Sequence, residues 1–190
     1  GNGLYLLDLE ESRLHPLDGE RKSYSGLRWD EEGQALAVLR GEKPEGKVQR
    51  ENVLVAFLRP GERRQEKILY DPAEDEGFPE GFVLSEYEAP SWSEDRSRIF
   101  LGVKEQREEP PRGNDRADVD VWHWADEDVQ SVQKVRANRN RRSTFASVLV
   151  LDGMHFLKLA DEEMPSVSFT DDGRWGIGRL DAPYRHEITW

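Results

Sequence analysis

The sequence contains no cysteine, only two methionines and no long apolar run. The lack of cysteine excludes a disulfide scaffold, a thiol nucleophile and cysteine-ligated metal sites. No stretch approaches 18 apolar residues, so we expect no membrane span. Basic residues are outnumbered, since 27 Lys and Arg stand against 39 Asp and Glu, for a formal net charge of −12. This negative charge argues against nucleic acid or anionic lipid as a partner.

The signals of a complete secreted protein or a self-contained enzyme are missing as well. The chain begins at Gly1 without an initiator Met, and its first residues have neither the basic nor the apolar region of a signal peptide. No Gly-x-Ser-x-Gly elbow, His-Glu-x-x-His pair or EF-hand loop is present, and no serine is marked as a partner for the four histidines. We therefore predict no catalytic, cofactor-binding or metal-ligating residue, and we expect no cofactor.

What the sequence does contain is an internal repeat. Residues 26–38, 89–101 and 166–178 align without gaps, and each has a short apolar stretch ending in an aromatic residue. An acidic turn and a second apolar stretch follow. This pattern predicts a β-hairpin with a tight turn of the Asp/Gly type. We call these three units the inner hairpins.

A second set of hairpins, the outer hairpins, alternates with the first. Residues 4–17, 52–70 and 147–159 each hold two segments rich in Val, Leu and aromatic residues around a turn. An inner and an outer hairpin together give four antiparallel strands, which is one blade of a β-propeller. The alternative is a β-sandwich, in which nothing requires one aromatic-turn-apolar unit to recur in the same order.

We therefore expect an all-β fold, a partial β-propeller of about two to three four-stranded antiparallel blades with one inserted helix. The single domain, residues 1–190, would be incomplete at both ends. Its parts would be an outer hairpin at 4–17, blades at 26–70 and 88–159, and the start of a further blade at 166–190. Both ends of the domain then look truncated, and the exposed apolar blade edges should make the isolated chain prone to association.

Three insertions interrupt the repeats. Residues 41–51 and 106–118 are rich in Glu, Pro, Gly and Arg and are predicted to be mobile surface loops, because they offer little apolar area to bury. Residues 126–141 are predicted to form the inserted helix. Their valines recur every three residues, Asp126 can cap the N-terminus, and bases gather in the last turn.

Several segments invite a functional interpretation. The carboxylates of Asp118 and Asp120, and of Asp171 and Asp172, are clustered but lack metal-ligand spacing, and the second pair is better explained as a hairpin turn before Gly173.

On a strand, Trp122 and Trp124 would share one face, with His123 on the other. The two indoles could stack on a ligand, but packing between blades is favoured.

Residues 134–142 hold five bases and no acid. They are interpreted as a helix C-terminus or a contact with another domain rather than as a nucleic-acid site.

The turns of the inner hairpins, Trp29 to Gly33, Trp92 to Arg96 and Phe169 to Gly173, resemble the W-S-P-D-G-type repeat of bacterial propellers. Such repeats occur in periplasmic Tol-type proteins and in the N-terminal domain of the prolyl oligopeptidase family of serine peptidases. Residues 118–124, 147–151 and 159–165 are similar to bacterial members of that peptidase family. The second repeat departs from the pattern, because Arg96 stands where glycine is usual and would be strained at positive φ.

This resemblance implies a function. In the peptidase family the propeller covers the mouth of an α/β-hydrolase domain, screens substrates by size and contacts the N-terminal side of the peptide. The catalytic residues lie in the hydrolase domain, so none is transferred here, and no substrate-clamping motif can be placed on Glu108 and Glu109.

The expected function is thus that of a non-catalytic segment that gates access and helps position the peptide. Its partners would be the peptide substrate and a hydrolase domain of the same parent chain, in a periplasmic or secreted bacterial protein. The alternative is a Tol-type interaction propeller with no associated enzyme. A stand-alone enzyme with its site in a propeller channel finds no convergent polar set in the sequence.

Overall fold

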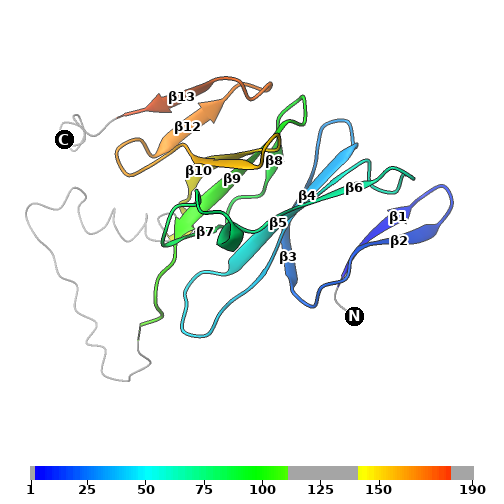
Figure 1. Ribbon diagram of the computed structural model, residues 1–190, viewed down its shortest axis with the longest axis horizontal. Coiled ribbons are helices and arrows are strands. Elements are labelled where there is room, and N and C mark those ends of the chain that lie inside the picture. Colours follow the sequence, from blue (N-terminus) through cyan, green and yellow to red (C-terminus); the bar gives the residue numbers. More distant parts are fainter. Residues whose placement is uncertain (1–2, 111–140, 181–190) are drawn as a thin grey trace, which may run out of the picture.

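The computed structural model describes residues 3–110 and 141–180, and within these ranges the fold is all-β, as expected (Figure 1). The predicted helix at 126–141 lies, except for Arg141, outside the described residues. The first strands are β1 (Leu4–Asp8), β2 (Arg13–Asp18), β3 (Ser23–Trp29), β4 (Ala35–Glu42), β5 (Glu51–Leu58) and β6 (Glu66–Tyr70). A 3-10 turn, η1 (Pro72–Glu74), precedes β7 (Phe82–Leu84), β8 (Ser91–Trp92), β9 (Arg98–Glu105), β10 (Phe145–Val150), β11 (His155–Lys158), β12 (Ser166–Phe169) and β13 (Gly176–Arg179).

All six predicted hairpins are present as antiparallel strand pairs. The inner hairpins are β3–β4, β8–β9 and β12–β13, and the outer hairpins are β1–β2, β5–β6 and β10–β11. Inner and outer hairpins join where β4 pairs with β5 and where β9 pairs with β10. The chain therefore forms two four-stranded meanders, β3–β6 and β8–β11, and β7 extends the second by pairing with the far end of β9.

The remaining two hairpins, β1–β2 and β12–β13, each form a separate two-stranded sheet among the described residues. In Figure 1 they lie at opposite ends of the molecule, with the β3–β6 and β8–β11 sheets between them. The order of the sheets in space thus follows their order in the chain.

The core lies between the faces of successive sheets. One face of the β3–β6 sheet packs against the β8–β11 sheet, where Leu39 and Leu54 meet Leu84, Ile99 and Leu149 in one apolar cluster. Its other face packs against the β1–β2 hairpin in a second cluster. Because both of its faces are covered, β4 is a continuous apolar run rather than an alternating one, and residues 35–39 are almost completely buried.

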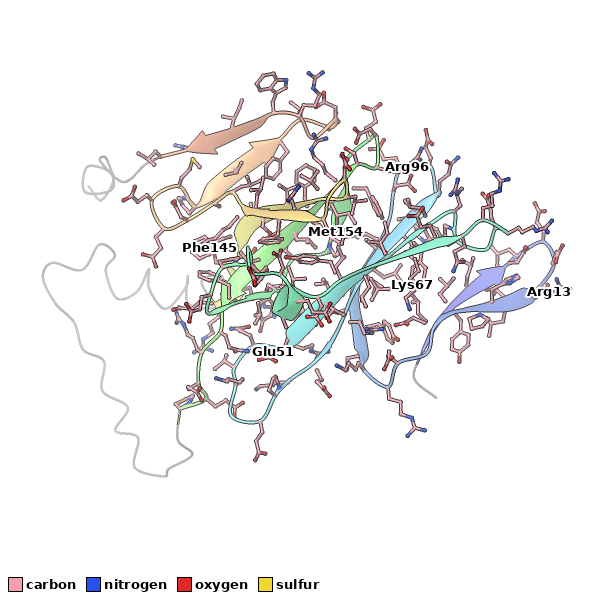
Figure 2. The ribbon with its side chains drawn as sticks, viewed as in Figure 1. Arg13, Glu51, Lys67, Arg96, Phe145 and Met154 are labelled. Atoms are coloured by element: carbon pink, nitrogen blue, oxygen red, sulfur yellow. The ribbon has the colours of Figure 1, made fainter. Side chains whose placement is uncertain are left out.

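A buried carboxylate joins the β1–β2 hairpin to the next sheet. Asp18, at the end of β2, is 4% exposed and accepts hydrogen bonds from Tyr24 of β3 (2.7 Å), Arg40 of β4 (2.8 Å) and Lys67 of β6 (2.6 Å). Figure 2 shows Lys67 on the side of its sheet toward this hairpin. Burial by itself would raise the pKa of Asp18, but the hydrogen bonds from Lys67, Tyr24 and Arg40 outweigh it and lower the pKa to about 2.

The two charged loops contact each other. Residues 41–51 and the described part of 106–118 do not stay independent of each other, because Val48 donates its backbone N–H to the Arg107 carbonyl (2.8 Å) and Lys47 forms a β-bridge with Glu108. Lys47 and Lys43 also pair with Glu108 and Glu109. The prediction considered apolar burial alone, whereas backbone hydrogen bonds and ion pairs hold these loops together.

Candidate functional site

The turns of the three inner hairpins are built alike. The residue after the aromatic accepts a hydrogen bond from the backbone N–H five positions later: Asp30 from Ala35 (2.7 Å), Ser93 from Arg98 (3.0 Å) and Thr170 from Trp175 (3.2 Å). Asp, Ser and Thr are interchangeable here because each places a side-chain oxygen close to its own backbone. The repeat recognised in the sequence is therefore also a repeat of hydrogen bonding.

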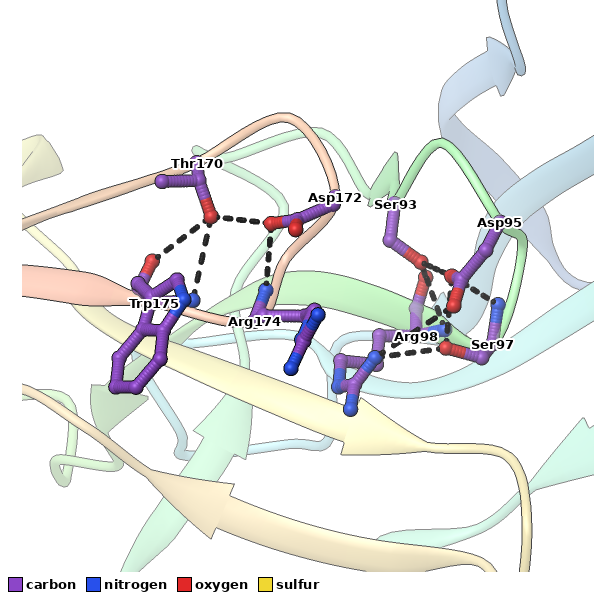
Figure 3. Close-up of polar contacts among 8 residues, drawn as sticks. All are labelled: Ser93, Asp95, Ser97, Arg98, Thr170, Asp172, Arg174 and Trp175. Carbon is purple, nitrogen blue, oxygen red and sulfur yellow. Dashed lines mark hydrogen bonds and ion pairs between the residues drawn. The ribbon is translucent and has the colours of Figure 1, made fainter.

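The second and third turns share a further contact, which Figure 3 shows. The Ser93 hydroxyl donates to Asp95 (2.7 Å), and the Thr170 hydroxyl donates to Asp172 in the same way. Asp95 also accepts from the Ser97 backbone N–H (2.9 Å), and Asp172 accepts from that of Arg174 (3.0 Å). This confirms the interpretation of residues 171–173 as a turn in which an aspartate caps its own backbone.

The fifth and last residue of each turn has a positive φ, 71° at Gly33, 58° at Arg96 and 67° at Gly173. The second repeat therefore carries a non-glycine residue in the left-handed region, where a side chain is strained. The Arg96 side chain also contacts the first turn, because it donates hydrogen bonds to Asp30 (2.9 Å) and Glu32 (3.0 Å).

These contacts bring the three turns together. Arg96 links the second turn to the first, and the backbone N–H of Glu94 donates to the carbonyl of Asp171 in the third (3.0 Å). The side chain of Asp30 is buried, with 6% of its surface exposed. Burial works to raise its pKa, but the bonds from the Ala35 backbone and from Arg96 prevail, so the pKa lies below its ordinary value and Asp30 stays charged. The structure thus places the Asp30 carboxylate beside the guanidinium of Arg96, which bridges the first two turns.

A pocket of about 260 Å³ lies between the turns. We call it the turn pocket. Five acidic residues line it, together with Ser93 and Trp92. Its lining residues are Asp30, Glu31, Glu32, Trp92, Ser93, Glu94 and Asp171. Carboxylates beside an aromatic ring suit a cationic group such as an ammonium or guanidinium. Among the described residues that line the pocket there is no histidine.

A second hollow, of about 500 Å³, lies by β7, β9 and the start of β10. Phe82 and Phe145 border it, and the Lys158 ammonium lies over both rings, 4.0 and 4.7 Å from their centroids. Lys104 also lines it, with a pKa lowered by burial and, secondarily, by Arg107. The hollow contains acids too, Glu105 and Glu162, so its charge does not select one kind of ligand.

The other sequence candidates separate into two groups. Asp118, Asp120, Trp122, His123 and Trp124, with residues 134–140, lie outside the described residues. Glu108 and Glu109 form ion pairs with Lys47 and Lys43 between the two charged loops. Across residues 3–110 and 141–180, no group of three or more His, Asp or Glu side chains is arranged to hold a metal ion.

Sequence reasoning missed the clustering of the three turns and the buried Asp18. The first could have been found from the equivalent positions of Asp30, Ser93 and Thr170, which carry interchangeable capping groups. The partners of Asp18 come from three other strands, and nothing local in the sequence connects them.

No family model, curated protein or solved structure matches this chain. The described residues include no helix long and apolar enough to cross a membrane. The assignment of a function therefore depends on the fold and the turn pocket.

Proposed function

We propose that the chain is part of a β-propeller and forms two of its blades, with a half-blade on either side. Two features support this architecture. Each complete sheet is a four-stranded antiparallel meander made of an inner and an outer hairpin, and successive sheets pack face to face in chain order. In a β-sandwich, by contrast, two sheets share one core and the outer faces meet solvent. Here both faces of the β3–β6 sheet are covered.

The proposed role is to gate access and help position a peptide for an α/β-hydrolase serine peptidase domain of the same parent chain. The observation that carries this role is the convergence of three repeat turns around a pocket of carboxylates. A peptide's α-ammonium group or a basic side chain is the chemistry that this pocket fits. Catalysis would belong to the hydrolase domain.

Peptide binding to the turn pocket tests the positioning role. Trp92 lines the pocket, so its fluorescence can report binding of a short peptide with a free N-terminus. We expect N-terminal acetylation of the peptide, or the substitution Glu94→Gln, to weaken binding about tenfold, because each removes one charge from a charge-assisted hydrogen bond. Glu11→Gln, on the exposed β1–β2 turn, is the matched control. Equal affinity of all variants and both peptides would contradict the role.

The link to a peptidase has its own test. The natural reading frame downstream of residue 190 should encode a Gly-x-Ser-x-Gly segment within an α/β-hydrolase pattern. A reading frame without it would favour the alternative, a Tol-type propeller that binds a protein partner through the same turn pocket. If the peptide binds but the reading frame encodes no hydrolase domain, the turn pocket remains the proposed binding site and the peptidase role is excluded.

A further inference from the structure

The acids that line the turn pocket hold two kinds of position in the repeated turns. Each turn presents its third residue to the pocket, which is Glu31 in the first turn, Glu94 in the second and Asp171 in the third. The first turn adds its second and fourth residues, Asp30 and Glu32. The repeat therefore supplies one acid from every turn, and the first turn supplies two more.

A guanidinium already occupies the two additional acids. Arg96 donates hydrogen bonds from Nη1 to Asp30 Oδ2 (2.9 Å) and to Glu32 Oε2 (3.0 Å). The other carboxylate oxygen of Asp30 accepts the backbone N–H groups of Gln34 and Ala35, both at 2.7 Å. Asp30 is thus bonded through both of its oxygens, and Arg96 provides a positive charge at the junction of the first and second turns (Figure 2).

The junction of the second and third turns is built differently. Gly173 stands at the position equivalent to Arg96, and a Cβ added there would lie only 3.0 Å from the ring of Phe100, so a bridging side chain has little room. The two turns are joined instead through the backbone, where the N–H of Glu94 donates to the carbonyl of Asp171 (3.0 Å). That bond holds two pocket acids side by side without using either carboxylate.

The three third-position acids have no partner within residues 3–110 and 141–180. Glu31, Glu94 and Asp171 are exposed, and none of their side chains makes a hydrogen bond or an ion pair with another described residue. Carboxylates that converge on one pocket attract a cationic group, because charge-assisted hydrogen bonds are stronger than neutral ones. The place for that group is the junction of the second and third turns, where two of these acids meet.

On the basis of the proposed function, we propose that Arg96 is a specificity-determining residue of the turn pocket. Because it holds Asp30 and Glu32, a second cation on the first-turn side of the pocket would find these acids already bonded and would meet the like charge of Arg96. The pocket therefore accepts one cationic group. The substrate class that fits is a peptide with a free α-ammonium group and an uncharged first side chain.

Calorimetric titration with two tripeptide amides tests this specificity. One is trialanine amide, with a single cationic group, and the other has arginine as its first residue, which adds a second. We expect the unaltered chain to bind the two with affinities within about threefold of each other. Arg96→Gly frees both first-turn acids and suits the positive φ, so the variant should prefer the arginine peptide by about tenfold or more.

Two further substitutions separate this effect from a general change of charge. Arg174→Gly removes an arginine of the third hairpin that makes no ion pair with a pocket acid among the described residues, so it should affect both peptides equally. Adding Glu32→Gln to Arg96→Gly should abolish most of the new preference. In the chain that keeps Arg96, Glu32→Gln should change the affinity for trialanine amide less than about twofold, whereas Glu94→Gln should weaken it about tenfold.

Two results would overturn the inference while leaving the proposed function supported. One is binding of trialanine amide with no added preference for the arginine peptide in Arg96→Gly, and the other is an equal loss of affinity from Glu32→Gln and Glu94→Gln. If Arg96→Gly disturbs the pocket and binds neither peptide, the comparison of Glu32→Gln with Glu94→Gln decides. An unaltered chain that binds neither peptide would contradict the proposed function, and the inference with it.

Discussion

The two end hairpins of the molecule are attached to their neighbouring sheets by different means. The β1–β2 hairpin is held by the buried carboxylate of Asp18, which reaches three strands of the β3–β6 sheet, and by the apolar contacts of Leu4 and Leu17. The β12–β13 hairpin is held by the stack of Phe169 on Phe100 and by one backbone bond between turns. The first attachment combines a buried polar network with apolar contacts, whereas the second consists of an aromatic stack and a backbone hydrogen bond between turns.

The difference shows how far burial depends on neighbours rather than on strand type. β4 and β13 are equivalent strands of inner hairpins, yet residues 35–39 of β4 are almost fully buried and all of β13 is exposed. β4 pairs on both edges and is covered on both faces, but β13 pairs with β12 alone. We therefore expect the two ends to differ in stability, with the β12–β13 hairpin opening first.

Removing the carboxylate of Asp18 should have the largest effect. Asp18→Ala leaves the cations of Arg40 and Lys67 without their partner, and breaking a buried pair in this way typically costs about 3–5 kcal/mol. Urea unfolding at neutral pH would measure the loss. Glu11→Ala, which removes an exposed ion pair with Arg13, is the control and should cost less than about 1 kcal/mol. Equal losses in the two variants would mean that the Asp18 network does not stabilise the fold.

The same carboxylate predicts a pH dependence. The pKa of Asp18 falls from 3.8 to about 2 on folding, so its contribution is complete above pH 4 and is lost as the pH falls toward 2. A shift of this size corresponds to about 2 kcal/mol. The free energy of unfolding of Asp18→Asn should decrease less than that of the unaltered protein over this range. Parallel pH profiles would contradict the assignment.

At the opposite end, Phe169→Ala should have an intermediate and local effect. Losing the stack on Phe100 and part of the apolar contact should cost about 2 kcal/mol. Because the hairpin is attached so sparsely, we expect hydrogen exchange to accelerate over residues 166–179 while β4 and β5 remain protected. Uniform acceleration across the chain would show that the two ends unfold together, and the contrast between them would fail.

The sequence was informative wherever the determinants are local. The six hairpins and the aspartate turn at residues 171–173 depend on residues close together in the chain, and both are confirmed. The bonds of Asp18 with Arg40 and Lys67, and the joining of residues 41–51 with Glu108, link residues 22 to 61 positions apart, which no local pattern encodes. The clustering of the three turns belongs to both classes, because each turn is local but their meeting depends on how the sheets stack.

The smallest expected effects come from substitutions in the turns. They measure the free energy that a side chain costs at a positive φ. At Gly33, φ is 71° and an added Cβ would meet nothing within 4 Å, so Gly33→Ala should lose about 1 kcal/mol through the backbone alone. At Arg96 the reverse holds, since the arginine already bears that cost and offsets it with bonds to Asp30 and Glu32.

Arg96→Ala and Arg96→Gly both remove those bonds, and they differ only in the backbone. The glycine variant should therefore be more stable than the alanine variant by about the same 1 kcal/mol that Gly33→Ala loses. Thermal unfolding of the three variants would measure both differences. Equal stability of the two Arg96 variants, with Gly33→Ala still destabilised, would mean that the second turn relaxes out of the left-handed region once its ion pairs to the first turn are gone.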